Sequence, residues 1–111
     1  MSERRLSIWD IQILLATVGM NGESYGASIA QYIEEATGRS VAVQTIYDAL
    51  DALEKKELVK AQPGPSSPQR GGRARLLIRV THAGEAALRQ HLEELDQLRR
   101  RCGETWEFSN A

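Results

Sequence analysis

Polar side chains recur along the stretch from 41 to 59, VAVQTIYDALDALEKKELV. If this stretch is helical, Gln44 and Thr45 lie in its first turn, where a glutamine can form two hydrogen bonds with adenine. Asp48 follows one turn later and can accept a hydrogen bond from the amino group of cytosine. Lys55, near the far end, offers a positive charge to a phosphate. A solvated helix face is the alternative, and these residues alone leave both interpretations open.

The charged residues from 58 to 80 are all basic: Lys60, Arg70, Arg73, Arg75 and Arg79. Arg73 and Arg75 alternate with Ala74, so on a strand both side chains leave the same face and can meet the phosphates of one DNA strand. A charged edge strand that prevents aggregation is the alternative. We favour phosphate contact, with Arg70 beside them, because both arginines follow the flexible pair Gly71-Gly72.

Two further residues could contact a DNA backbone. Arg39 lies in the turn before the polar stretch and has a similar but weaker claim than the arginines at 73 and 75. Tyr47 could donate its hydroxyl to a phosphate, or it could pack its ring on the strands that follow and leave the hydroxyl in water. The sequence favours neither role of Tyr47.

Catalytic and metal-binding chemistry has little support. His82, His91 and Cys102 are the only soft ligands or nucleophiles, and they have neither metal-site spacing nor a clustered base. We therefore expect no enzyme activity, no metal and no cofactor. Cys102 is the single cysteine and cannot form an internal disulfide, which fits a reducing, cytoplasmic location.

Composition is that of an ordinary globular domain. The chain has 111 residues, of which 41% are hydrophobic and 26% charged, so we expect one domain with a modest core. Net charge is −1 and the pI is about 6.1, so any attraction to nucleic acid must come from local clusters. No apolar run has membrane-spanning length, and the first residues lack the apolar core of a secretory signal, so no membrane partner is expected.

Periodicity places the polar stretch on a helix. Its apolar residues recur at steps of three and four: Val43, Ile46, Leu50 and Leu53. A shorter helix, capped by Ser24 and stopped at Thr37-Gly38, should precede it and make a helix-turn-helix. Two β-type runs at about 58–80 should follow as a hairpin, or wing. We expect residues 1–80 to form a winged helix-turn-helix domain.

The first and last helices carry more apolar surface than one small core requires. The first should begin at a capping box of Ser7 and Asp10 and run to Met20. It has one stripe of Ile8, Ile11, Leu15 and Val18, expected in the core, and a second of Trp9, Ile13, Ala16 and Met20, expected to face a partner chain. The last helix, 81–103, should be capped by Thr81 and carry a seam of Leu88, His91, Leu95, Leu98 and Cys102 for helix pairing. Residues 104–111 are expected to be a frayed tail.

Four segments resemble the PadR family of bacterial transcriptional regulators: YGASIAQYIEEATGR, TIYDALDALEKKELV, RGGRAR and VTHAGEAAL. The resemblance covers roughly Leu14 to Leu88, and the wing PGPSSPQRGGRAR is similar to that of the short, single-domain members. Glu57 stands where the family usually has a glycine that ends the recognition helix, and Ala42 replaces the usual hydroxyl cap. The resemblance implies a winged-helix dimer that represses transcription, with the first and last helices making the dimer.

The combined expectation is a mostly α fold with a small β-hairpin: a winged helix-turn-helix with a long C-terminal dimerisation helix. The expected partners are double-stranded DNA, at a near-palindromic operator, and a second copy of the chain. The resemblance also suggests a small aromatic effector beside Trp9 that releases the repressor. The alternative is a protein-interaction module that uses the acidic face of the third helix, where Asp48 and Asp51 lie three residues apart.

Overall fold

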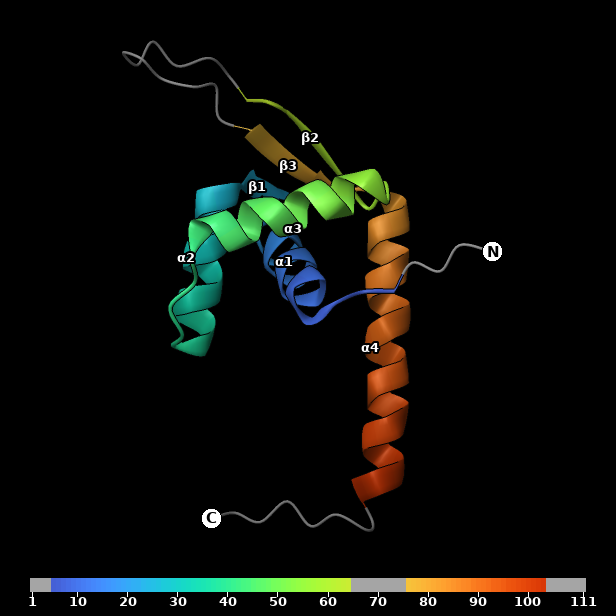
Figure 1. Ribbon diagram of the computed structural model, residues 1–111. Helices are drawn as coiled ribbons and strands as arrows, with labels where there is room; N and C mark the ends of the chain where they lie inside the picture. The colour runs from blue at the N-terminus through green and yellow to red at the C-terminus, as the bar shows by residue number, and fades with distance from the viewer. Residues whose placement is uncertain (1–4, 65–75, 104–111) are drawn as a thin grey trace.

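The chain folds into four helices and a small sheet, seen in a computed structural model that describes residues 5–64 and 76–103. The elements in chain order are α1 (Ile8–Gly19), β1 (Glu23–Tyr25), α2 (Gly26–Thr37), α3 (Val43–Lys55), β2 (Val59–Pro63), β3 (Leu76–Val80) and α4 (His82–Gly103). The first three helices pack together beside the sheet, whereas α4 runs on well beyond them (Figure 1). The fold is mostly helical and of the winged helix-turn-helix type, as the sequence predicts. No helix in the described ranges is both long enough and apolar enough to span a bilayer.

The sheet contains one strand more than the expected hairpin. Strands β2 and β3 pair antiparallel as predicted, and β1 adds on the other side of β3, giving the order β1-β3-β2. Ser24, expected to cap α2, instead lies in β1 opposite Ile78 and is buried. The N-cap of α2 is Tyr25, which makes no side-chain capping bond. The prediction for Ser24 is wrong because pairing with β3 holds its backbone in a strand.

Helix α1 begins at the predicted capping box. The Ser7 amide donates to the Asp10 carboxylate at 3.0 Å, and the Asp10 amide donates to the Ser7 hydroxyl at 3.1 Å. The helix ends before Asn21 and Gly22, which both have positive φ, at 70° and 88°. Both boundaries agree with those expected from the sequence.

The two apolar stripes of α1 are oriented opposite to expectation. Ile13 and Ala16 are buried in the core of the single chain, so the expectation that they face a partner is wrong. Trp9 and Met20, from the same stripe, are partly buried against that core. Of the stripe assigned to the core, Ile8, Leu15 and Val18 are exposed, Ile8 by 71%, whereas Ile11 is partly buried against the core. The reason is that α1 packs against α2, α3, α4 and the sheet, and this common side carries residues 13, 14, 16 and 17.

The helix-turn-helix is held by contacts within the turn between α2 and α3. Helix α2 ends at Gly38, which takes the left-handed conformation with φ 76°, as predicted. The Val41 amide then donates to the Glu34 carboxylate at 2.7 Å, which ties the start of α3 to α2. Helix α3 buries Ile46, Leu50 and Leu53 as expected. Val43, assigned to the same buried stripe, is 41% exposed because it lies at the first position of the helix, beyond the core.

Helix α4 has a buried beginning and an exposed remainder. The predicted cap is present, since the Gly84 amide donates to the Thr81 hydroxyl at 3.0 Å. Gly84 is required because a β-carbon there would collide with the Leu58 carbonyl oxygen. Leu88 is expected in a partner-facing seam, and this prediction is wrong because Leu88 is buried in the core of this chain. Further along, Leu95 and Leu98 are exposed, and His91 and Cys102 are partly buried.

Candidate nucleic-acid interface

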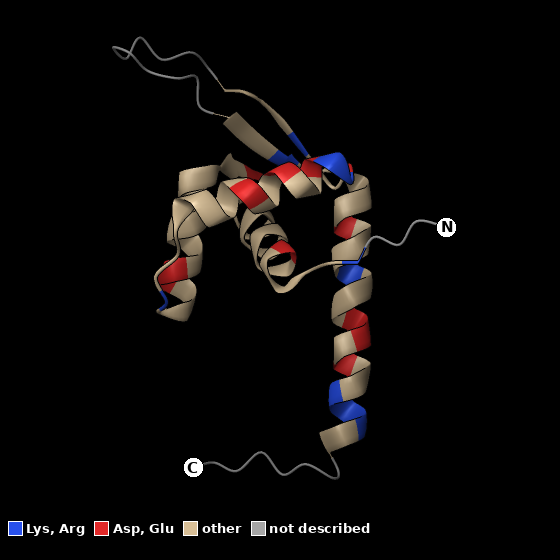
Figure 2. Cartoon of the chain, in the orientation of Figure 1, with Lys and Arg blue, Asp and Glu red and all other residues tan. Residues whose placement is uncertain are grey.

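The outward face of α3 presents the polar residues that the sequence singles out. Gln44, Tyr47, Asp48 and Lys55 are exposed, and Thr45 is half-buried. Because Ile46, Leu50 and Leu53 anchor the opposite face, these side chains are held on one side of a fixed helix. Acidic residues lie along the exposed part of α3 and lysines at its C-terminal end (Figure 2).

Gln44 and Asp48 are joined by a hydrogen bond on this face. The Gln44 amide nitrogen, Nε2, donates to Asp48 Oδ1 at 2.9 Å. The two residues are four apart on an α-helix, the spacing at which side chains meet. The sequence places both residues on one face, and the i, i+4 spacing was the feature that could have predicted their pairing.

The Tyr47 ring packs on the start of α2. A β-carbon at Gly26 would lie 2.6 Å from the Tyr47 ring carbon Cε1, so the ring rests directly on this glycine. The Tyr47 side chain is nevertheless part of the exposed face of α3. The packing that the sequence suggested against the wing is thus made against α2 at Gly26.

The N-terminal end of α3 is open. Its N-cap, Ala42, makes no side-chain capping bond, in keeping with the departure from the family pattern at this position. Arg39, in the preceding turn, is exposed, and its amide donates to the Thr37 hydroxyl at 3.2 Å. The helix start and the Arg39 side chain therefore lie on accessible surface.

The wing is described only near its base. Arg70, Arg73 and Arg75 lie outside the described residues. Of the basic residues from 58 to 80 that are described, Lys60 is exposed and Arg79 forms an ion pair with Glu23 of β1, at 3.3 Å. An acid from a different part of the chain therefore partly neutralises this basic stretch. The sequence alone does not predict this ion pair, because the two residues are far apart along the chain.

Comparison with known proteins identifies the family. The model of the Transcriptional regulator PadR-like family matches residues 14–90 of the 111-residue chain. The chain belongs to this family. A search of curated proteins gives no match.

Solved structures similar to this PadR-like chain have the same fold. A PadR family transcription regulator from Clostridium difficile is 27% identical, with a TM-score of 0.66 over 86% of this chain and 96% of that one. A PadR family transcriptional regulator from Eggerthella lenta is 20% identical, with a TM-score of 0.70 over 87% and 82%. F93 from STIV, a winged-helix DNA-binding protein, is 14% identical, with a TM-score of 0.69 over 86% and 95%.

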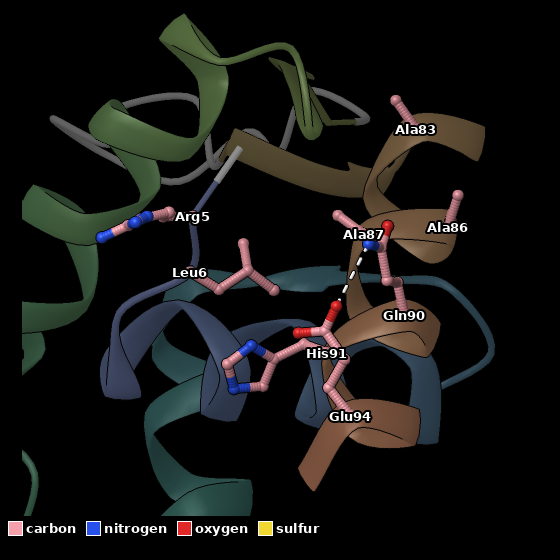
Figure 3. A pocket seen from close by; sticks show the side chains of 8 residues that line it. All are labelled: Arg5, Leu6, Ala83, Ala86, Ala87, Gln90, His91 and Glu94. Atoms are coloured by element: carbon pink, nitrogen blue, oxygen red, sulfur yellow. Dashed lines mark hydrogen bonds between the residues drawn. The ribbon is translucent and has the colours of Figure 1, made fainter. Parts of the chain in front are cut away.

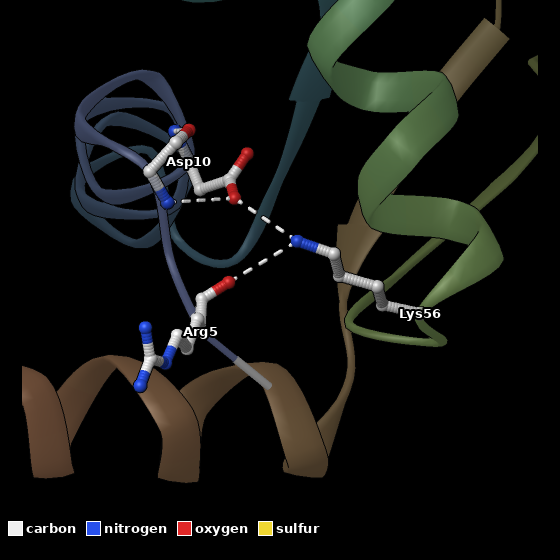
Figure 4. Close-up of polar contacts among 4 residues, drawn as sticks. Arg5, Asp10 and Lys56 are labelled. Carbon is white, nitrogen blue, oxygen red and sulfur yellow. Dashed lines mark hydrogen bonds and ion pairs between the residues drawn. The ribbon is translucent and has the colours of Figure 1, made fainter. Parts of the chain in front are cut away.

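A polar contact connects α3 of this PadR-like chain to α1. Lys56 Nζ, at the end of α3, lies 3.5 Å from Asp10 Oδ2 and donates to the backbone oxygen of Arg5 at 3.1 Å (Figure 4). Asp10 is buried and also completes the cap of α1, so one carboxylate serves both helices. Sequence reasoning missed Lys56, because no local pattern relates residues 46 positions apart.

A groove of about 720 Å³ lies between the N-terminal segment and α4 of the PadR-like chain (Figure 3). Its lining is Arg5, Leu6, Ala83, Ala86, Ala87, Gln90, His91 and Glu94. Trp9, the predicted ligand neighbour, is not among these residues and instead packs against the core. Within residues 5–64 and 76–103, no group of three His, Cys, Asp or Glu side chains is arranged to hold a metal ion.

Proposed function

We propose that this PadR-like chain is a sequence-specific DNA-binding regulator, a homodimeric repressor at a near-palindromic operator. The observation that carries the proposal is the exposed polar face of α3, whose first turn bears Gln44 immediately after the helix-turn-helix turn. In winged helix-turn-helix proteins the first residues of this helix reach base edges in the major groove. The family assignment and a fold shared with a winged-helix DNA-binding protein support the proposal.

Backbone contacts would come from the basic residues around the reading helix. We assign Arg39 and Lys55 to phosphates because both are exposed beside α3. Arg70, Arg73 and Arg75 are assigned to phosphates from the sequence alone. Contacts of this kind position the protein without reading sequence, and each one makes the affinity fall more steeply as the salt concentration rises.

A second copy of the chain would cover the outward stripe of α1. Ile8, Leu15 and Val18 expose apolar side chains there, and Leu95 and Leu98 do so on the projecting half of α4. Burying these side chains removes apolar surface from water, the main favourable term in association. A two-fold dimer would present two α3 helices, which is the reason to expect related half-sites in the operator.

The oligomeric state is tested by mass. Light scattering should give twice the chain mass, and removal of residues after Arg89 should give monomer or insoluble protein because the exposed leucines of α4 are lost. Leu15→Glu should also shift the full chain towards monomer, since it places a charge in the outward stripe. A full-length monomer at micromolar concentration would contradict the dimer.

A small aromatic effector would bind the groove between the N-terminal segment and α4. Leu6, Ala83 and Ala87 give this groove an apolar wall, and Gln90 and Glu94 give it a polar rim. Trp9 is close in sequence to Leu6 and serves as the fluorescence reporter of binding, not as a lining residue. Unchanged tryptophan fluorescence and unchanged DNA release across a panel of aromatic ligands would refute the effector.

Selection of bound sequences from a random DNA pool tests the function directly. The proposal predicts enrichment of two half-sites related by symmetry, confirmed by a mobility shift that survives competitor DNA. The second candidate, a protein-interaction module, is favoured by the exposed acids of α3, Asp48 and Asp51. No enrichment from the pool, together with capture of a defined protein that Asp48→Asn and Asp51→Asn abolish, would establish that module instead.

A further inference from the structure

We propose that Gln44 and Asp48 act together to read adenine in each half-site, with Asp48 as the positioning residue for the Gln44 amide. The proposal rests on the DNA-reading role of α3 proposed above and names the base and the device that selects it. It starts from one contact, the hydrogen bond of 2.9 Å from Gln44 Nε2 to Asp48 Oδ1.

The position of the pair suits a reading role. Gln44 lies in the first turn of α3 and Asp48 one turn later, and both side chains are exposed on the face opposite the buried residues. Long side chains at this end of a recognition helix are the ones that reach base edges. Because both side chains are exposed, their remaining hydrogen-bonding groups can also contact a base.

The hydrogen-bonding groups of Gln44 determine which base fits. A glutamine amide has two N–H donors and one carbonyl oxygen, and the ionised Asp48 can only accept. Once one N–H is given to Asp48, one donor and one acceptor remain. Adenine presents a matching pair in the major groove, the N6 amino donor and the N7 acceptor.

The other bases match this reading pair less well. Guanine presents two acceptors, N7 and O6, and the Gln44 oxygen would face one of them. Thymine presents an acceptor and a methyl group, and cytosine presents a donor without an adjacent acceptor. Asp48 sharpens the choice, because a glutamine held through one N–H has fewer orientations in which its amide could turn to suit guanine.

Two similar pairs among the described residues serve as controls. Gln31 donates to Glu35 on α2 at 3.1 Å, and Gln90 donates to Glu94 on α4 at 3.2 Å. Both have the same amide-to-carboxylate chemistry at the same spacing on exposed helix surface. Neither lies in the first turn of α3, so loss of either carboxylate removes a comparable bond without touching the proposed reading position.

The test replaces single adenines of the selected operator by 7-deazaadenine, which keeps base pairing and lacks only the N7 acceptor. At one adenine per half-site this should weaken binding of the parent protein by about 3- to 10-fold, the effect of one hydrogen bond. The same replacement should cost Gln44→Ala nothing further. A bound operator with no adenine sensitive to this change would overturn the inference and leave the proposed function standing, whereas absence of any selected operator would overturn both.

The role of Asp48 is separated by its variants. In Asp48→Ala the 7-deazaadenine effect should fall to within about twofold. In Asp48→Asn it should be retained, because the asparagine oxygen can still accept from Gln44. Glu35→Ala should behave as the parent does. An undiminished effect in Asp48→Ala, with helix content unchanged by circular dichroism, would show that Asp48 does not position Gln44.

Discussion

Helices α1 and α3 have almost the same length, 12 and 13 residues, yet they present opposite chemistry to solvent. Helix α3 buries Ile46, Leu50 and Leu53 and turns polar groups outward. Helix α1 buries more residues than α3 does and still exposes the apolar side chains of Ile8 and Leu15. The difference indicates two kinds of surface: that of α3 suits water or DNA, whereas that of α1 favours an apolar partner.

The largest effect should come from the buried side of α1. Ile13→Ala should lower the free energy of unfolding by about 2–5 kcal/mol, because Ile13 is fully buried and the change leaves a cavity. Chemical denaturation measured at several protein concentrations checks this, and the loss should persist at all of them.

Leu15→Ala is the matched control on the outward side of the same helix. Its effect should grow with protein concentration, because only the dimer is expected to bury Leu15. Equal losses for Ile13→Ala and Leu15→Ala at every concentration would contradict the contrast between the two sides of α1.

The packing of α3 on α2 is tested at Gly26. Gly26→Ala should cost about 1 kcal/mol, at the low end for overpacking because the half-exposed Tyr47 ring can swing away. The same change made in Tyr47→Ala should be neutral or stabilising, since the clash is gone. Identical effects in the two backgrounds, measured by a double-mutant cycle, would show that Tyr47 does not rest on Gly26.

The contact between Lys56, at the end of α3, and Asp10 of α1 should contribute less to stability. Lys56→Met should lower stability by about 0.5–1 kcal/mol, a value discounted because the Lys56 side chain is 39% exposed. The difference from the parent should shrink at high salt, as expected for a screened ion pair. Lys55→Met, which changes the neighbouring exposed lysine, is the control, and an equal loss there would argue against a specific contact with Asp10.

The smallest effect is expected from replacing an exposed acid of α3. Asp51→Asn should raise affinity for random DNA by about a few tenths to 1 kcal/mol, because a solvent-screened charge facing phosphates is removed. Glu94→Gln removes the same charge from α4 and should change that affinity less. Binding to random DNA that is unaltered by Asp51→Asn would place this part of α3 away from the duplex.

Apart from Val43, the sequence predicts the buried face of α3 correctly, because this helix has a single apolar stripe and so only one way to face the core. The caps at Ser7 and Thr81 and the left-handed Gly38 are equally local features, and each was predicted. Helix α1 has two stripes of similar strength, and only its packing against three helices and two strands decides which is buried. Strand β1 was missed because three residues with a single partner strand leave almost no periodic pattern.

In the candidate site too, local features are predicted from the sequence and long-range contacts are not. Periodicity places Gln44, Tyr47 and Asp48 on one face because Tyr47 and Asp48 follow Gln44 by three and four residues on the same helix. Contacts between distant residues, such as Lys56 with Asp10 or Arg79 with Glu23, depend on the tertiary fold and have no counterpart in a local pattern. The long-range contacts are therefore where the structure adds most to the sequence.

If the outward face of α3 reads DNA sequence, Gln44→Ala should separate binding to the operator from binding to random DNA. Affinities for the selected operator and for random DNA should be measured at one fixed salt concentration, with Gln31→Ala as the control on α2. We expect Gln44→Ala to lose about 1–3 kcal/mol of binding free energy for the operator and almost none for random DNA, while Gln31→Ala changes neither. Operator binding by Gln44→Ala equal to that of the parent protein would show that this face of α3 does not read the operator.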